Sequence, residues 1–190
     1  MRVRIASSLL MASTLCAAMP LRASSSGAPI CHVDQIIGCP MGFPVPSGAG
    51  IYALQIVPAA YTPGQPITIS VLPGNTFSLL NGILLYVERP DQLGGDGYPL
   101  KVGDFSVPPA GVQLACAFNP TTQALTHDGG GNLALPIGFT WTAPVGLDVP
   151  LRVRAMLVRA GSEYNWDNAP FEVFSIDLPR SPLLFTDSFE

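Results

Sequence analysis

Apolar and polar residues alternate in short stretches from residue 51 to the C-terminal part of the chain. Within 67–72, for example, Ile67, Ile69 and Val71 fall on one face of an extended backbone. A period of two is typical of a β-strand that buries one face. The pattern predicts eight short strands, at 51–57, 67–72, 77–87, 104–107, 112–118, 133–141, 151–159 and 171–176.

Turn-forming residues separate these stretches. In Tyr61-Thr62-Pro63-Gly64 the proline presets φ, and Gly64 is suited to the positive φ of a type II turn. Asn81-Gly82 interrupts the 77–87 run and predicts a bulge in that strand. The sequence shows no internal repeat and no amphipathic helical stretch. We therefore expect an all-β chain folded as an antiparallel β-sandwich.

The N-terminus has the layout of a secretory signal. Arg2 and Arg4 precede an apolar, small-residue run that ends at Leu21, and the first acidic residue is Asp34. We expect a signal peptide at 1–23, the sandwich domain at 24–180 and a C-terminal tail at 181–190. The run is too short for a retained anchor, so the mature chain is expected to have no integral membrane segment. Its expected location is outside the cytoplasm: secreted, at the cell surface or in the periplasm.

The charge balance narrows the choice of partners. The chain has 9 basic and 13 acidic residues, a formal net charge of −4. Loss of Arg2, Arg4 and Arg22 with the signal would leave 9 − 3 = 6 basic residues and a net charge of −7. A chain this acidic is poorly suited to nucleic acid or anionic membranes, and no nucleic-acid partner is expected.

Three cysteines remain after cleavage: Cys31, Cys39 and Cys116. In an oxidising compartment two of them are expected to pair. A Cys31–Cys39 bridge would close a short loop. A bridge from either residue to Cys116 would close a long loop and stabilise the fold by about 4 kcal/mol in the loop-closure model. The long bridge is the favoured interpretation.

The candidate ligand-binding residues are three arginines and a tryptophan. Arg152 and Arg154 share the face of strand 151–159 that points away from the core, and Arg159 ends the strand. One interpretation is a solvated face paired with nearby glutamates; the other is a cationic patch for sulfate, phosphate or carboxylate groups on a glycan. Trp166 lies in a polar loop and is a candidate for ligand contact, whereas Trp141 is expected in the core.

Motifs for catalysis are missing from the sequence. It contains no nucleophile elbow, no zinc-protease motif and no phosphate-binding glycine loop before a helix. His32 and His127 are the two imidazoles. We assign no catalytic residue, no cofactor and no metal ligand, and predict that the chain is not an enzyme. Two alternatives remain: a metal- or redox-linked accessory that uses the spare cysteine and His127, and a structural surface protein attached through its tail.

The order and spacing of several short motifs resemble the Reeler domain, the module at the N-terminus of reelin and of spondins. The resemblance spans roughly residues 28–175. Its pieces are Gly27-Ala28-Pro29, Tyr61-Thr62-Pro63-Gly64, Asn81-Gly82-Ile83-Leu84-Leu85, Gly103-Asp104-Phe105, Cys116 with Thr126-His127, and Phe139-Thr140-Trp141-Thr142-Ala143-Pro144.

The resemblance implies an immunoglobulin-like sandwich in which an early cysteine, Cys31 or Cys39, bonds Cys116. It also implies an extracellular, non-catalytic role in binding a glycan or another protein. The tail at 184–190 is similar to short acidic–aromatic C-termini of exported proteobacterial proteins, which is the basis for expecting a bacterial secreted version. The functional hypothesis is an exported binding module for a cell-surface or extracellular glycan or protein.

Overall fold

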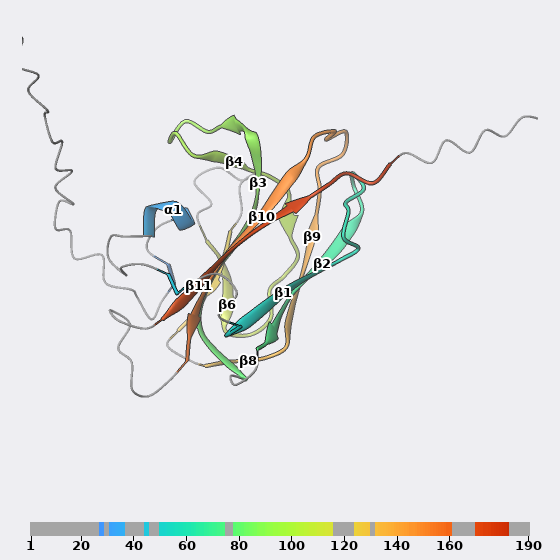
Figure 1. Ribbon diagram of the computed structural model, residues 1–190. Helices are drawn as coiled ribbons and strands as arrows, with labels where there is room; N and C mark the ends of the chain where they lie inside the picture. The colour runs from blue at the N-terminus through green and yellow to red at the C-terminus, as the bar shows by residue number, and fades with distance from the viewer. Residues whose placement is uncertain are drawn as a thin grey trace, which may run out of the picture.

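The computed structural model describes residues 27–28, 31–36, 44–45, 50–74, 78–115, 124–129, 132–160 and 170–182. In this part of the chain two sheets pack face to face as a β-sandwich (Figure 1). All strand pairings between named strands are antiparallel. The all-β sandwich predicted from the alternating pattern is confirmed.

The smaller sheet has the strand order β1-β2-β9-β5. Its strands are β1 (Tyr52–Val57), β2 (Pro66–Pro73), β9 (Ile137–Thr142) and β5 (Asp104–Phe105). The larger sheet has the order β11-β10-β3-β7-β6, with β4 and β8 also paired to β3. Its strands are β11 (Phe171–Leu178), β10 (Leu151–Arg159), β3 (Leu79–Leu93), β7 (Ala124–His127), β6 (Val112–Ala115), β4 (Pro99–Lys101) and β8 (Leu133–Ala134).

Strand β3 is the spine of the larger sheet. It runs for 15 residues, well beyond the predicted end at 87. One edge pairs with β10, and the other pairs in succession with β8, β7 and β4. The sequence pattern did not predict β4 or β7, which have three and four residues. The predicted 133–141 strand is divided into β8 and β9.

Two local predictions are confirmed by the backbone. Gly64 has φ of +74°, and the Gln65 amide donates to the Thr62 carbonyl at 3.0 Å, as a type II turn requires. The register between β10 and β3 shifts between Val158, opposite Gly82, and Arg159, opposite Leu80. This shift places the bulge where Asn81-Gly82 predicted it.

The core between the sheets is centred on two aromatic side chains. Trp141 and Tyr61 are both 0% exposed and meet edge to face, with ring centroids 6.5 Å apart. Trp141 Nε1 donates to the Val102 carbonyl at 3.1 Å, and the Tyr61 hydroxyl donates to the Val149 carbonyl at 2.6 Å. Burial therefore leaves neither polar group unpaired. The core position predicted for Trp141 is confirmed.

Gly103 is dictated by this packing. Its φ is +75°, and a Cβ there would lie 2.4 Å from Trp141 Cζ2. No other residue type has both the backbone freedom and the absence of a side chain that this contact needs. The Gly-x-Phe motif at 103–105 is thus explained by the tryptophan 38 residues later in the sequence.

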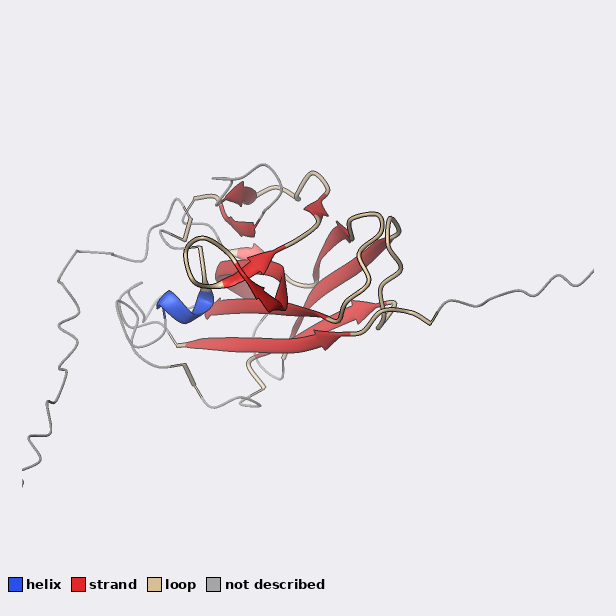
Figure 2. Ribbon diagram, turned by 90° about the horizontal axis from the view of Figure 1, so that it is seen from above, coloured by secondary structure: helices blue, strands red, loops and turns tan. Residues whose placement is uncertain are grey.

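The larger sheet is also covered on its outer face, the face turned away from the smaller sheet. The short helix α1 (Val33–Ile36) lies against this face (Figures 1 and 2). Under it a second apolar cluster forms, made of Val33, Leu84, Tyr86, Ala124, Met156, Val158 and Phe171. Strand β3 is therefore buried on both faces over most of its length. Among the described residues, no helix is long and apolar enough to cross a bilayer.

Candidate functional site

Ionisable side chains gather at one end of the outer face of the larger sheet. We call this group the outer-face cluster; it consists of His32, Asp34, Tyr86, Glu88, Asp96, Tyr98, Lys101 and Arg154. The sheet register brings it together, because Glu88 of β3 lies opposite Lys101 of β4, and Tyr86 lies opposite Arg154 of β10. The segment around α1 supplies His32 and Asp34, and the connection between β3 and β4 supplies Asp96 and Tyr98.

His32 is the centre of the cluster. It is 3% exposed and stacks on Tyr98, with ring centroids 4.6 Å apart. Its Nε2 lies 2.9 Å from Asp96 Oδ2 and 2.7 Å from Lys101 Nζ. One ring nitrogen either donates or accepts, so Nε2 serves the carboxylate as a donor or the ammonium as an acceptor, but not both at once.

Burial disfavours positive charge in this cluster. Lys101 is 6% exposed, its Nζ lies 4.8 Å from the centre of the Tyr86 ring, and desolvation lowers its pKa to about 8. Desolvation, followed by the charge of Lys101, also lowers the pKa of His32. The pKa of Asp96 is lowered, first by the hydrogen bond from the Tyr98 amide.

Glu88 carries a buried carboxyl group. It is 2% exposed, and its Oε2 has no hydrogen-bond partner in the described part of the chain. Desolvation raises its pKa against the opposing effect of Arg154.

The outer-face cluster holds the N-terminal segment on the sandwich. The Val33 amide donates to the Tyr86 hydroxyl at 3.1 Å, and Arg154 pairs with Asp34 of α1. Each of these contacts joins the segment at 31–36 to a strand of the larger sheet. The cluster thus fastens the segment at 31–36 to the sheet: His32, Glu88 and Lys101 are buried, whereas the carboxylates of Asp34 and Asp96 stay about half exposed to solvent.

The structure does not gather the three candidate arginines into one patch. Arg152 pairs with the exposed Asp177 at 3.0 Å, and Arg154 is nearly covered by its contact with Asp34. Arg159 lies beyond the bulge at the other end of β10. The face of Arg154 is not a solvated face, because α1 covers it; the sequence pattern of β10 contained no information about this cover. Trp166 lies outside the described residues.

His127 and Thr126 have structural positions in β7. His127 is 5% exposed, and its Nδ1 lies 3.3 Å from the Ile83 amide nitrogen. Thr126 Oγ1 accepts a hydrogen bond of 2.7 Å from the Ala28 amide. Thr126 lies within β7, and His127 is the last residue of that strand. Among the described residues, no three His, Cys, Asp or Glu side chains are placed to share a metal ion.

The cysteine pairing stays a prediction. Cys31 directly precedes His32, so a bridge from Cys31 to the body of the domain would reinforce the attachment of the segment at 31–36. Cys39 and Cys116 lie outside the described residues.

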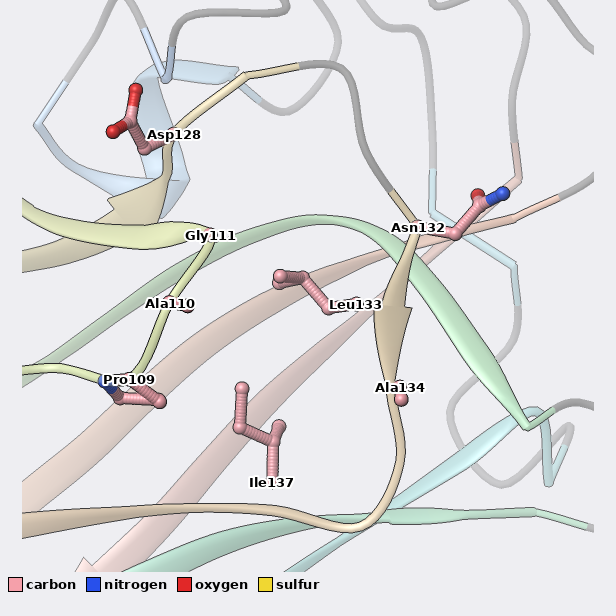
Figure 3. A pocket seen from close by; sticks show the side chains of 8 residues that line it. All are labelled: Pro109, Ala110, Gly111, Asp128, Asn132, Leu133, Ala134 and Ile137. Atoms are coloured by element: carbon pink, nitrogen blue, oxygen red, sulfur yellow. The ribbon is translucent and has the colours of Figure 1, made fainter.

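A cavity of about 500 Å³ opens to solvent at the end of the sandwich where three connections meet. We call it the loop-end cavity; Figure 3 shows the residues that line it, Pro109, Ala110, Gly111, Asp128, Asn132, Leu133, Ala134 and Ile137. Its wall is mostly aliphatic, and Asp128 and Asn132 lie at its rim. Neither side chain has a hydrogen-bond or ion-pair partner within the described residues.

The sequence did not single out this cavity. Its lining comes from the β5–β6 connection, the end of β7, β8 and the start of β9.

The chain is thus an antiparallel β-sandwich with two polar regions. The outer-face cluster is largely buried and contacts the N-terminal segment, and the loop-end cavity is open to solvent. The Reeler domain family matches residues 41–178, more than half of the chain, and the chain belongs to this family. No curated protein matches it in sequence.

Two solved structures share the fold. The crystal structure of the human F-spondin reeler domain, fragment 1, is 17% identical, covers 69% of this chain and 88% of its own, and has a TM-score of 0.51. The Reelin-N domain of F-spondin is 16% identical, covers 70% of this chain and 87% of its own, and has a TM-score of 0.51. At this identity the likeness concerns the fold alone.

Proposed function

We propose that this chain is an exported, non-catalytic binding module that recognises a cell-surface or extracellular glycan or protein. Membership of the Reeler family, whose domains are extracellular-type modules, supports the class. The acidic–aromatic tail supports a bacterial secreted version. One observation carries the proposal: the polar side chains of the outer-face cluster bond one another, whereas those of the loop-end cavity have no partner among the described residues.

The outer-face cluster is unsuited to catalysis. A general base must reach a proton on a substrate, but His32 is covered by Tyr98 and bonded to Asp96 and Lys101. His127 is equally enclosed against the backbone of Ile83. His32 and His127 are buried, as catalytic residues often are, but their contacts hold parts of the fold together.

The loop-end cavity has the features of a recognition site. Its volume of about 500 Å³ is within the range of about 300–1,000 Å³ typical of small-ligand sites. It combines an aliphatic wall with two unpaired polar side chains at the rim. Loops at the end of a sandwich are also the usual place for binding sites on this architecture.

The proposal is tested by measuring binding of the purified protein to immobilised peptidoglycan, lipopolysaccharide, neutral polysaccharides, sulfated glycans and extracellular matrix proteins. An Asp128→Ala, Asn132→Ala double variant and an Arg152→Ala, Arg154→Ala, Arg159→Ala triple variant locate the surface used. Saturable binding to one class, reduced in one variant, supports the proposal. Absence of saturable binding to every member of the panel by the folded protein overturns it.

A further inference from the structure

The segment at 31–36 is held on the outer face by a few side-chain contacts rather than by its own secondary structure. Helix α1 has four residues, which is too short for a helix that is stable by itself. Val33 is 0% exposed and packs in the second apolar cluster, and its amide donates to the Tyr86 hydroxyl at 3.1 Å. The other contacts of the segment are those of His32 and Asp34 with charged groups of the outer-face cluster. The position of the segment therefore depends on the charges in this cluster.

His32 can bond both of its charged neighbours only while its ring is neutral. A neutral imidazole has one N–H donor and one acceptor nitrogen. If Nε2 donates to Asp96 Oδ2 at 2.9 Å, Nδ1 remains as the acceptor, and it lies 3.3 Å from Lys101 Nζ. A protonated ring has two donors and no acceptor, so the ammonium group of Lys101 loses its partner. Protonation of His32 thus removes an attractive contact between the segment and β4.

The same protonation places two cations against each other. Lys101 Nζ lies 2.7 Å from His32 Nε2, and the two residues are 6% and 3% exposed. Lys101 has a pKa of about 8, so it is charged throughout the acid range. Water screens like charges poorly at such depth, and the imidazolium is more stable once His32 has left the sheet and is hydrated.

Other charged groups of the outer-face cluster set the balance. Asp96 opposes release of the segment, because its carboxylate bonds the imidazolium as well as the neutral ring, and its lowered pKa keeps it ionised in mild acid. Its side chain is 55% exposed, so water weakens this attraction. The remaining titratable groups of the cluster are Asp34 of α1, Tyr86 and Glu88 of β3, Tyr98 of the β3–β4 connection, Lys101 of β4 and Arg154 of β10.

Glu88 also opposes release in acid. Desolvation raises its pKa, and the charge of Asp34 adds to this effect. Three cations lower it: Arg154, Arg152 and Lys101. When α1 leaves, Glu88 is no longer close to Asp34, so its pKa falls and the carboxyl group loses its proton more readily. Proton uptake by His32 on release is therefore partly offset by proton loss from Glu88.

We propose that protonation of His32 in mild acid releases His32 and α1 from the outer face while the two sheets remain paired. Tyr86, Lys101 and the apolar cluster beneath α1 then become accessible to solvent. The predicted bridge from Cys31 would keep the released segment tethered to the domain. Release does not depend on which ligand the domain recognises.

The pH window follows from the titration of His32. Its ordinary pKa is 6.5, and desolvation, followed by the charge of Lys101, lowers the pKa while the segment is held. Below about pH 6.5 the released ring therefore binds a proton that the held ring does not. In this window the ratio of released to held segment rises by up to about tenfold for each pH unit.

The test uses the full oxidised protein, labelled with ¹⁵N, between pH 7.5 and 5.0. Hydrogen exchange of the Val33 amide reports the held segment, because this amide bonds the Tyr86 hydroxyl. The Leu85 amide of β3, a strand paired on both edges, reports the sheet. Dividing the intrinsic exchange rate by the observed rate gives a protection factor free of the chemical effect of pH. From pH 7.5 to 5.0 the protection factor of Val33 is expected to fall at least about threefold, and that of Leu85 to stay unchanged.

Three variants remove the titrating groups. His32→Phe keeps a ring beside Tyr98 that cannot be protonated, so the acid-dependent fall at Val33 disappears. His32→Gln keeps a donor and an acceptor without a titrating ring, and gives the same result. Glu88→Gln removes the opposing proton loss, so the fall at Val33 is larger than in the parent protein.

A matched pair of variants tests the role of Asp96. Asp96→Asn removes the carboxylate that stabilises the imidazolium, so the fall at Val33 is again larger than in the parent. Asp91→Asn changes an exposed carboxylate of the same β3–β4 hairpin, one that pairs with Arg89, and leaves the fall as it is in the parent.

Three results overturn the inference. A protection factor of Val33 that does not fall in the parent protein shows that the segment stays held in acid. A fall that persists in both His32→Phe and His32→Gln assigns the release to another group. An equal fall at Leu85 shows that the whole sandwich loosens. None of these results bears on binding to the panel of glycans and proteins, which tests the proposed function separately.

Discussion

The outer-face cluster and the loop-end cavity differ in both the number of ionisable groups and their availability. The cluster contains a histidine, a lysine, an arginine and three carboxylates, and most of them contact one another between α1 and the larger sheet. The cavity contains one carboxylate and one amide, both at the rim. The region with many ionisable groups, the outer-face cluster, is therefore the one that holds the N-terminal segment on the sheet. The loop-end cavity has fewer polar groups, but these have no partner among the described residues.

This difference has a physical basis. Buried charges are tolerated only when other groups compensate them or when their pKa shifts toward the neutral form. In the outer-face cluster His32 and Lys101 bond each other, and the pKa of Glu88, whose Oε2 has no partner among the described residues, is raised. Rim groups stay hydrated and can exchange water for a ligand at little cost. Perturbed pKa values, which often indicate active sites, here report internal packing.

The largest effect on the free energy of unfolding is expected in the core of the sandwich, which supports both regions. Gly103→Ala should lower the free energy of unfolding by about 3–5 kcal/mol, because the new Cβ would collide with Trp141 at a left-handed backbone position. Gly146→Ala is the matched control: φ is +80° and no atom lies within 4 Å of the added Cβ. Its loss should be about 1 kcal/mol. Equal losses in urea denaturation would contradict the packing argument.

A smaller effect on the free energy of unfolding is expected when the contacts of the outer-face cluster are removed. His32→Ala should reduce stability by about 2–3 kcal/mol, because it removes the stack on Tyr98 and leaves the buried Lys101 without its imidazole partner. His32→Phe should recover part of this loss by restoring the stack. Arg89→Ala, which removes an exposed pair with Asp91, should show no measurable change. A His32→Ala variant as stable as the parent would show that the cluster does not fasten the segment.

The next effect concerns pH. Lys101 has a pKa of about 8 in the folded protein and about 10.5 when unfolded, so between these values the unfolded chain binds more protons. Stability should rise by about 1–2 kcal/mol between pH 7.5 and 9.5, and the rise should be absent in Lys101→Met. This window lies below the titration of Tyr52 and Tyr86, whose pKa values are raised to about 12. An identical rise in Lys101→Met would assign it to another group.

His32 adds a contribution of the same sign at lower pH. Its pKa in the folded protein is lowered, so stability should fall as pH drops below about 6.5 and the unfolded chain takes up the proton first. Glu88 has the opposite effect on stability. Its pKa is raised in the folded protein, so the folded chain binds more protons than the unfolded chain at acid pH, and the contribution of Glu88 to stability falls as pH rises.

The smallest effect on stability is expected at the cavity rim. Asp128→Ala and Asn132→Ala should each change the free energy of unfolding by less than about 0.5 kcal/mol, because neither side chain has a partner to lose. The same two substitutions, combined in one variant, test whether the cavity rim takes part in the binding measured with the panel of glycans and proteins. A large loss of stability would show that these side chains support the fold and would end the contrast with the outer-face cluster.

Part of the molecule could be predicted because its signals are local. Alternation located β1, β2, β10 and β11 to within one or two residues, and the bulge at Asn81-Gly82 followed from a glycine inside a strand. The short strands β4 and β7 gave no periodic signal, and pairing with β3 created them. The parity of Arg154 was predicted correctly, but its contact with Asp34 of α1 joins residues 120 apart in sequence and gives no signal in the pattern of β10.

By itself, the sequence determined the all-β class, the turn at Gly64 and the inward faces of the main strands, because each depends on residues close together along the chain. Tertiary structure decided which polar groups are buried and which are accessible. His32, Asp96 and Lys101 are up to 69 residues apart in sequence, yet they meet within hydrogen-bonding distance. Asp128 and the turn at Gly111 likewise meet only when β6 and β7 pair. Desolvation depends on what covers a side chain in space, and no pattern along the chain contains that information.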